Sequence, residues 1–294
     1  MIEGITPMKR RTLVKAIAGM GLAQALPFSV PATAQEPFSF GLTPVFLDSD
    51  IELLNELEAY LSEAMSRPVS LVKRRTYQEI TALLLSGELD AAWICGFPFV
   101  QHVDRLALVA VPLYRKQPLY ESYIIVPANR GITRWEDLRG DIHAFSDPDS
   151  NSGYLVTAAL LAQSELTPGT FFSKTFFTYG HRNVIRAVAS GLAQSGSVDG
   201  YVWDVMSARE PELVSQTKVL RRSEELGFPP IACLRTNLDT EEIEKLADAL
   251  VSISKNETGR NVLSMLQLDG FAVEPETTYA GIAAKYELVQ RKGG

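Results

Sequence analysis

The sequence has few of the residues that build disulfide frameworks and metal centres. It contains two cysteines, Cys95 and Cys233, and three histidines, His102, His143 and His181, in 294 residues. Two cysteines can form at most one disulfide, so stability does not depend on a disulfide network. The histidines show no His-Glu-x-x-His spacing and there is no Cys-x-x-Cys pair. We therefore expect no metal site, no cofactor and no zinc-dependent chemistry.

Excess positive charge and long apolar segments are also missing. The chain has 28 lysines and arginines against 35 aspartates and glutamates, a formal net charge of -7. This balance provides no basic excess to attract nucleic acid or anionic lipid. No apolar run reaches the roughly 20 residues that a membrane-spanning helix needs. We expect an acidic globular protein with no nucleic-acid partner and no membrane insertion once its amino terminus has been processed.

The amino terminus has the three parts of a cleavable signal peptide. Lys9, Arg10 and Arg11 precede a mildly apolar stretch at residues 16–26, and small residues follow it. We predict a signal peptide over residues 1–34 and export to the periplasm. The paired arginines also fit the twin-arginine pattern, with export by the Sec route as the alternative.

Short apolar runs bounded by turn residues alternate with segments of helical period in the rest of the chain. This alternation predicts an α/β protein with a mainly parallel sheet. The expected strands are residues 38–43, 69–73, 90–94 and 122–127, the last after a proline-rich connection, and the expected helices are residues 51–67 and 77–86.

A polar loop follows the strand expected at residues 143–146 and precedes a helix expected at residues 154–164. Its sequence is Asp-Pro-Asp-Ser-Asn-Ser-Gly, ending at Gly153. The first turn of a helix has unpaired N–H groups and a partial positive charge, so it attracts anions, and Ser150 and Ser152 add hydroxyl donors. The plain structural interpretation is that one serine only caps the helix. Three polar side chains followed by a glycine favour a site for a phosphate-like anion.

The segment from Asp147 to Val156 resembles the ligand loop of the phosphonate-, phosphite- and phosphate-binding proteins of ABC importers. Further segments occur in the order of that family: Thr76-Tyr77, residues 87–93, Gly180-His181, residues 187–191 and Val198-Asp199-Gly200. The resemblance covers nearly all of the chain after residue 34. It implies a type II periplasmic-binding-protein fold, in which two lobes enclose a ligand cleft.

The resemblance also implies how the chain divides between the lobes. The first lobe would combine residues 35–122 with residues 222–294, and the second lobe, residues 123–221, would be inserted between them. The ligand residues implied for the inserted lobe are Ser150, Asn151, Ser152, Gly153 and His181, and those implied for the other lobe are Tyr77 and Tyr120. A histidine can donate an N–H to an oxyanion whether neutral or charged, and a nearby anion favours the charged form.

The chain departs from the aminophosphonate-binding members of the family. Where those proteins carry carboxylates that bind the ligand's amino group, this chain has Asp204, offset by one residue, and Pro229. Proline cannot pair with a cation, so an aminoalkylphosphonate is disfavoured. Asp204 would instead accept a proton from a partly protonated oxyanion, because a carboxylate repels a fully ionised phosphate.

Cys95 lies at the carboxyl end of an expected strand, where ligand sites form in α/β proteins. A thiol forms no bond with phosphate, but it bonds to arsenite. Arsenite-sensing periplasmic proteins belong to the same broad family. As an arsenite ligand, Cys95 would be an accessible thiol with a lowered pKa. The other interpretations are a buried apolar residue and a disulfide with Cys233.

Together these features predict a monomeric periplasmic solute-binding protein and not an enzyme. The loop around Ser152 lacks the Gly-x-Ser-x-Gly elbow of serine hydrolases. The expected ligand is a small phosphorus oxyanion (phosphate, phosphite or phosphonate), and the expected partner is an ABC permease. The alternative is a sensor that presents an arsenite-type oxyanion to the periplasmic domain of a histidine kinase.

Overall fold

The computed structural model describes residues 36–45 and 51–292. The signal peptide predicted for residues 1–34 lies outside these ranges. No helix in the described part of the chain is long and apolar enough to cross a membrane.

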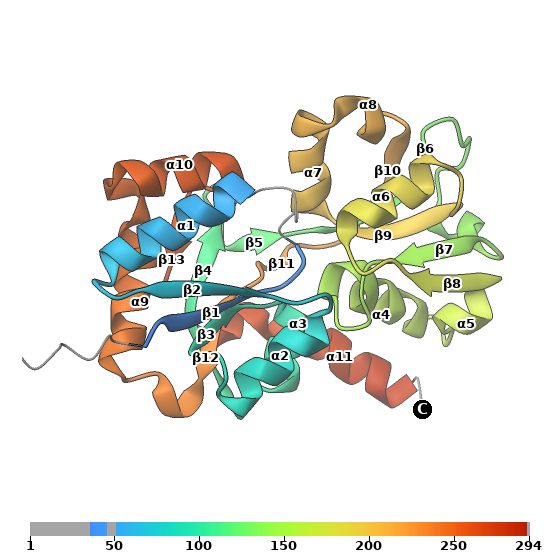
Figure 1. Ribbon diagram of the computed structural model, residues 1–294. Helices are drawn as coiled ribbons and strands as arrows, with labels where there is room; N and C mark the ends of the chain where they lie inside the picture. Colours follow the sequence, from blue (N-terminus) through green and yellow to red (C-terminus); the bar gives the residue numbers. More distant parts are fainter. Residues whose placement is uncertain (1–35, 46–50, 293–294) are drawn as a thin grey trace, which may run out of the picture. The chain divides into compact units, whose positions relative to one another are not determined.

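One six-stranded sheet, in the order β13-β4-β12-β3-β1-β2, organises what we call lobe 1 (Figure 1). Its strands are β1 (Phe38–Leu42), β2 (Val69–Lys73), β3 (Ala91–Trp93), β4 (Leu106–Leu113), β12 (Ile231–Leu234) and β13 (Gly270–Ala272). Its helices are α1 (Ile51–Ala64), α2 (Tyr77–Ser86), α3 (Gly96–Gln101), α9 (Glu241–Ser252) and α10 (Glu257–Leu266), with short 3-10 turns at Arg235–Asn237, Ile253–Lys255 and Glu276–Tyr279.

A five-stranded sheet, in the order β10-β6-β9-β7-β8, organises lobe 2. Its strands are β6 (Ser122–Pro127), β7 (Ile142–Phe145), β8 (Lys174–Phe177), β9 (Ser195–Asp199) and β10 (Thr217–Arg222). Its helices are α4 (Val156–Ala162), α5 (Pro168–Phe171), α6 (His181–Ala189), α7 (Gly200–Arg209) and α8 (Pro211–Val214), with a 3-10 turn at Trp135–Leu138 and a π-helical turn at Asn151–Leu155.

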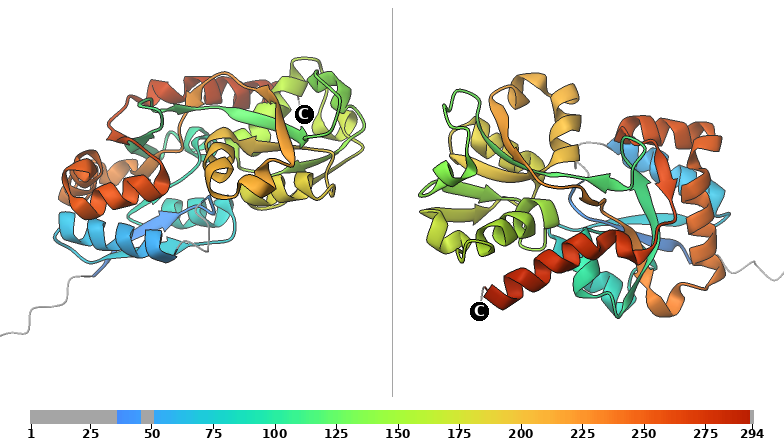
Figure 2. Two further views of the ribbon diagram at one scale, coloured as in Figure 1. Left: turned by 90° about the horizontal axis from the view of Figure 1, so that it is seen from above. Right: turned by 180° about the vertical axis from the view of Figure 1, so that it is seen from behind.

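The chain passes between the lobes where β6 begins and where β10 ends. Beside these crossings, β5 (Leu119–Tyr120) pairs with β11 (Leu226–Gly227), and the Ser223 N–H donates to the Ser122 carbonyl (2.9 Å). The last helix, α11 (Ala280–Lys292), packs against α3 of lobe 1 and α4 of lobe 2 (Figure 2). The lobes are therefore joined by two strand crossings and by one helix that contacts both.

The sheets are mixed, so the expectation of a mainly parallel sheet is wrong. β1 pairs in parallel with β2 and β3, and β7 with β8 and β9, but the other pairings in both sheets are antiparallel. β4 lies in the segment that was expected to be a proline-rich connection. Pro112 is tolerated there because the end of β4 that contains it pairs only with β13, while β12 pairs with the preceding part.

Local sequence explains where two helices near the site begin and end. Helix α2 starts with a capping box, in which the Thr76 hydroxyl accepts from the Glu79 N–H and the Glu79 carboxylate accepts from the Thr76 N–H, and it ends at Gly87 (φ 79°). Helix α1 was expected to reach residue 67 but stops at Ala64, because Ser66 adopts a left-handed conformation (φ 51°) just ahead of Pro68.

Candidate functional site

The polar loop after β7 is fixed by its own hydrogen bonds. The Ser150 hydroxyl accepts from the Gly153 N–H (2.9 Å), so Ser150 caps the following turn as the plain structural interpretation expected. The Asp147 carboxylate accepts from the Asp149 N–H (2.8 Å) and from the Tyr77 N–H of lobe 1 (3.3 Å). Instead of one regular helix over residues 154–164, a π-helical turn leads into α4. Such turns occur frequently at functional sites.

Gly153 lets this turn lie directly on the end of β7. A Cβ atom at this position would lie 1.8 Å from Oγ of Ser146 and 2.7 Å from its Cβ. The Ser146 N–H also donates to the Gly153 carbonyl (3.2 Å). Only a residue without a side chain fits this close approach, which explains the glycine at the end of the polar run.

Three buried polar atoms of this region have no hydrogen-bond partner among the described residues. They are Oγ of Ser146, Oδ1 of Asn151 and Oγ of Ser152, and each of these residues is at most 1% exposed. Leaving a buried polar group unpaired costs about 1–3 kcal/mol. Three such groups lie close together in the chain, which makes this region the candidate site.

Lobe 1 brings a tyrosine and a thiol to the same loop. The Asn151 side-chain amide donates to the Tyr120 hydroxyl (2.9 Å), and the Asn151 backbone N–H donates to Sγ of Cys95 (3.2 Å). Burial raises the pKa of the Tyr120 phenol, and the Ser152 and Asn151 side chains partly oppose this increase. Asn151 and its neighbours are therefore enclosed by both lobes.

His181, at the start of α6, has a neutral ring in the protein without an anion; the charged form was expected only beside an anion. Its Nδ1 accepts from the Asp199 backbone N–H (3.0 Å), so that nitrogen carries no proton. The proton of the neutral ring is on Nε2, which lies 3.2 Å from the Tyr77 hydroxyl. Burial lowers the pKa of His181 to about 3. The ring is held as a neutral N–H donor that faces lobe 1.

Both tyrosines are left with a hydroxyl proton to donate. The Tyr77 oxygen accepts from His181 and the Tyr120 oxygen accepts from Asn151, so neither phenol uses its own hydrogen in these contacts. Burial raises the pKa of both phenols well above the usual value, which keeps them protonated. Two O–H donors of lobe 1 thus lie at contacts with lobe 2, one beside His181 and one beside Asn151.

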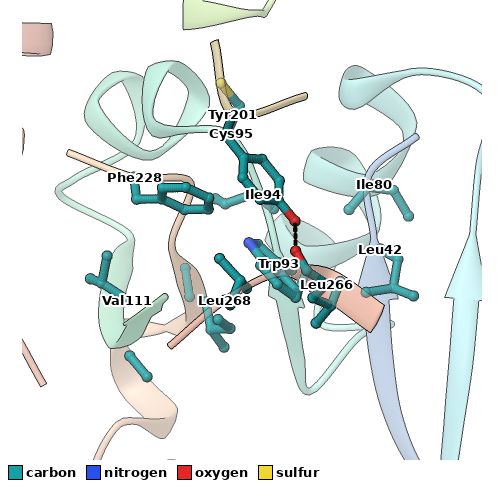
Figure 3. Packing of buried hydrophobic residues seen from close by; sticks show 14 of the residues in the cluster. Leu42, Ile80, Trp93, Ile94, Cys95, Val111, Tyr201, Phe228, Leu266 and Leu268 are labelled. Carbon is teal, nitrogen blue, oxygen red and sulfur yellow. Dashed lines mark hydrogen bonds between the residues drawn. The ribbon is translucent and has the colours of Figure 1, made fainter. Parts of the chain in front are cut away.

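Cys95 is a buried, free thiol, and the expectation of an accessible thiol with a lowered pKa is wrong. It is 4% exposed, and burial raises its pKa to about 12. Cys233 is also free and buried, so the disulfide alternative does not form. Figure 3 shows Cys95 among buried residues that include Tyr201 and Phe228. Its contact with the Asn151 N–H nevertheless places the sulfur against the polar loop.

Asp204, expected beside the ligand, makes its hydrogen bonds elsewhere. Its carboxylate accepts from the Tyr114 hydroxyl (3.0 Å), Nη2 of Arg115 (2.9 Å) and the Tyr123 hydroxyl (3.3 Å). None of these bonds reaches the polar loop. Because this carboxylate already has three donors, it is a poor acceptor for a ligand O–H.

The structure adds residues that the sequence analysis did not select. The Ser122 hydroxyl donates to the Ser152 carbonyl (2.6 Å), which ties the loop to a strand crossing. Asp199 is buried and caps α7, its Oδ1 accepting from the Val202 N–H (3.2 Å). Asp199 was visible in the Val-Asp-Gly segment that resembles the family, but nothing in the segment indicated that strand β9 ends at the loop. Among the described residues no cluster of histidine, cysteine or acidic side chains could hold a metal ion.

Comparison with known proteins gives one family and several solved structures of the same fold. Residues 40–279 match the family described as periplasmic substrate-binding proteins of phosphonate ABC transporters. A binding protein component of an ABC phosphonate transporter from Pseudomonas aeruginosa is 22% identical, with 87% of this chain and 88% of that chain covered and a TM-score of 0.79. PhnD1 from Prochlorococcus marinus, solved with methylphosphonate, is 18% identical, with coverages of 87% and 98% and a TM-score of 0.74.

Proposed function

We propose that this chain, which belongs to the periplasmic substrate-binding proteins of phosphonate ABC transporters, captures a small phosphorus oxyanion between its two lobes for import. The observation that carries the proposal is the set of unpaired groups on Ser146, Asn151 and Ser152, in a loop whose Asn151 amide donates to the Tyr120 hydroxyl of lobe 1. The family consists of transport proteins that bind a substrate without converting it.

The donors at the site suit an oxyanion of low charge. Tyrosine and serine hydroxyls, the neutral His181 and the backbone N–H groups of the loop can all donate to phosphoryl oxygens. None of the side chains that make these contacts is a lysine or arginine. The contacts are therefore neutral hydrogen bonds, which compensate a single negative charge more easily than two.

An aromatic wall next to Tyr120 favours a ligand with a small substituent or none. Phe228 packs against Tyr120 (ring centroids 5.5 Å apart) and against Tyr201 (5.1 Å). The Tyr201 hydroxyl crosses to lobe 1 and donates to the Leu266 carbonyl (Figure 3). The Pro229 carbonyl, near the position where an amine would need a carboxylate, already accepts from the Trp93 indole N–H (2.9 Å). Methylphosphonate, phosphite and phosphate fit these limits better than an aminoalkylphosphonate.

A ligand held by both lobes would stabilise the closed arrangement. Contacts between the lobes already run from Tyr77 to His181 and from Tyr120 to Asn151. A ligand that bonds to all four residues binds the closed state better than an open one, and it shifts the population accordingly. We propose that the closed protein, as a monomer, delivers its ligand to an ABC permease.

Binding can be tested with the purified protein by thermal shift and calorimetry. Methylphosphonate, phosphite or phosphate at 100 times its Kd should add about 2.7 kcal/mol of stability. Replacing both Ser150 and Ser152 by alanine should weaken binding by about 2–4 kcal/mol, because hydrogen bonds to a charged ligand are lost. Ser215→Ala, at an exposed serine of lobe 2, is the control and should bind normally. If none of the three ligands moves the melting temperature of the unaltered protein, the proposal is wrong.

A second ligand class is supported by the contact between Cys95 and the Asn151 N–H. Arsenite can exchange an As–O bond for an As–S bond at this thiol, whereas phosphorus oxyanions form no such bond. The importer is the better supported role, because the matched family is one of transport proteins. Calorimetry with both ligands separates the two classes. Cys95→Ser should change methylphosphonate binding by no more than ~1 kcal/mol, and loss of a measurable arsenite affinity in this variant would identify a thiol-binding sensor instead.

A further inference from the structure

The binding scheme described above leaves unused a hollow of about 730 Å³ that is lined by residues of both lobes. The lobe 1 wall includes Lys73, at the end of β2, and the two residues that follow it, Arg74 and Arg75. The lobe 2 wall includes Tyr179, between β8 and α6, and Asn183 in the first turn of α6. The hollow therefore lies where the two lobes meet.

The hollow adjoins the residues that join lobe 1 to lobe 2 at the proposed site. Arg75 comes two residues before Tyr77, and Tyr179 comes two residues before His181. Two residues of chain span at most about 7 Å, so both walls begin close to the point where the Tyr77 hydroxyl lies 3.2 Å from Nε2 of His181. The Tyr77 N–H also donates to the carboxylate of Asp147 in the polar loop (3.3 Å).

Positive charge predominates among the described residues that line the hollow. Lys73, Arg74 and Arg75 are all exposed. Within the described part of the chain, the guanidinium of Arg75 has no ion pair, and that of Arg74 donates to the Lys73 carbonyl (2.8 Å). The lining also contains the carboxylate of Glu79, which accepts from the Arg75 and Thr76 N–H groups (3.0 Å each). Three cations against this one carboxylate leave a net positive charge.

This charge is in contrast to the rest of the molecule. The formal net charge of the chain is -7, and the contacts proposed for the ligand include no lysine or arginine side chain. An approaching oxyanion is therefore repelled by the protein as a whole and meets only neutral donors at the site itself. Cations that line a cleft raise the local concentration of anions and can increase association rates about 10- to 1,000-fold.

We propose that this hollow is the entrance through which the oxyanion reaches the site, and that Arg74 and Arg75 steer it there, so that they set the association rate. This inference rests on the proposed function. The hollow has room for roughly 20 water molecules, each of which takes about 30 Å³ in the liquid. An oxyanion in the hollow thus keeps its hydration shell, and it is attracted there without being held.

Binding kinetics test the role of the two arginines. Phosphorus NMR exchange spectroscopy measures the dissociation rate of methylphosphonate, and calorimetry measures its Kd, so the two together give the association rate. At about 0.01 M salt, where the Debye length is about 30 Å, the double variant Arg74→Gln/Arg75→Gln should associate about three- to tenfold more slowly than the unaltered protein. Its dissociation rate should be unchanged, so its Kd should rise by the same factor. At about 1 M salt, where the Debye length is about 3 Å, the difference should disappear.

The matched control is Lys255→Gln/Arg260→Gln. It removes the same two charges from exposed positions of lobe 1 that do not line the hollow. Because the net charge changes equally in both double variants, only the position of the lost charges differs. The control should associate at nearly the rate of the unaltered protein at both salt concentrations.

The outcomes separate this inference from the function on which it rests. Equal association rates for the two double variants at low salt would overturn the role of the arginines and leave oxyanion binding intact. Faster dissociation with an unchanged association rate would also overturn it, because the arginines would then contact the bound ligand. Failure of methylphosphonate, phosphite and phosphate to bind the unaltered protein would overturn the proposed function itself. If the double variant does not fold, Arg74→Gln and Arg75→Gln are measured singly, and each should show part of the decrease in the association rate.

Discussion

At the scale of single residues, buried polar side chains connect the stability of this protein to pH. Away from the ligand loop, His143 in β7 is fully buried, with Nδ1 2.8 Å from Oγ of Ser195 and Nε2 2.9 Å from Oγ of Ser197. Its ring stacks on Phe172 with centroids 4.2 Å apart. Burial lowers the pKa of His143 to about 3. The folded protein thus keeps this ring neutral at a pH where the unfolded chain protonates it.

This difference predicts a slope in the stability of lobe 2 below neutral pH. The stabilisation that comes from keeping His143 neutral is fully present above about pH 6.5, the pKa of histidine in the unfolded chain. It is lost as the pH falls toward 3, at up to about 1.4 kcal/mol per pH unit. Asp199, with a raised pKa, has the opposite effect, because its stabilisation is lost as pH rises through about 7. When the pH falls from 7 to 5, the free energy of unfolding of His143→Gln should therefore decrease by about 2 kcal/mol less than that of the unaltered protein. Urea unfolding of both proteins at the two pH values measures the difference, and parallel losses would contradict it.

Sequence patterns located the polar loop but not every residue around it. Ser150, Asn151, Ser152 and Gly153 are contiguous, so one resemblance identified them together. Asp199 and Ser122 come from neighbouring strands of a sheet whose order cannot be read from periodicity. Asp204 was selected from the family pattern, which gave no sign that its carboxylate is occupied by Tyr114, Arg115 and Tyr123. The protonation of His181 depends on the backbone N–H that its Nδ1 accepts from, which is that of Asp199. This is a tertiary contact, so the sequence alone could not predict it.

At the scale of elements, the site depends on how the π-helical turn lies against the end of β7. The sequence predicted both the strand and the start of a helix here because turn residues separate two apolar segments. It could not predict a π-helical turn, which needs the packing of Gly153 on Ser146. The strand β4 was not predicted for a similar reason. A proline disfavours a strand unless its pairing partner is known, and Pro112 pairs only with β13.

Gly153→Ala should disable the loop. The new methyl group would lie 1.8 Å from Oγ of Ser146, so the turn must move away from β7 and the unpaired groups must lose their alignment. We expect a loss of at least tenfold in affinity for methylphosphonate and a lower melting temperature, with a destabilisation of about 1–3 kcal/mol. Calorimetry and thermal unfolding provide both values.

Gly169→Ala on helix α5 is the matched control. The nearest atom to a new methyl group there is 4.0 Å away, and its binding and stability should stay close to those of the unaltered protein. Normal methylphosphonate affinity in Gly153→Ala would mean that the loop tolerates displacement and that the ligand lies elsewhere.

At the scale of the whole molecule, two mixed sheets with crossings at β6 and β10 place the ends of several strands and helices around one loop. The division into lobes followed from the family resemblance, and composition alone would have allowed a single large domain. The mixed strand order could not be predicted, because the antiparallel strands β12 and β13 return to lobe 1 after about 100 residues of lobe 2. The fold matters for function because neither lobe alone supplies the donors of the proposed site.

The central claim, that a phosphorus oxyanion is bound by both lobes at once, is tested most directly by a crystal structure of the protein with methylphosphonate. We predict that phosphonate oxygens lie within hydrogen-bond distance of Oγ of Ser152 on lobe 2 and of the Tyr120 hydroxyl on lobe 1. The unpaired side-chain oxygens of the loop should then have partners. A structure in which methylphosphonate contacts one lobe only, or lies away from residues 146–153, would contradict the account.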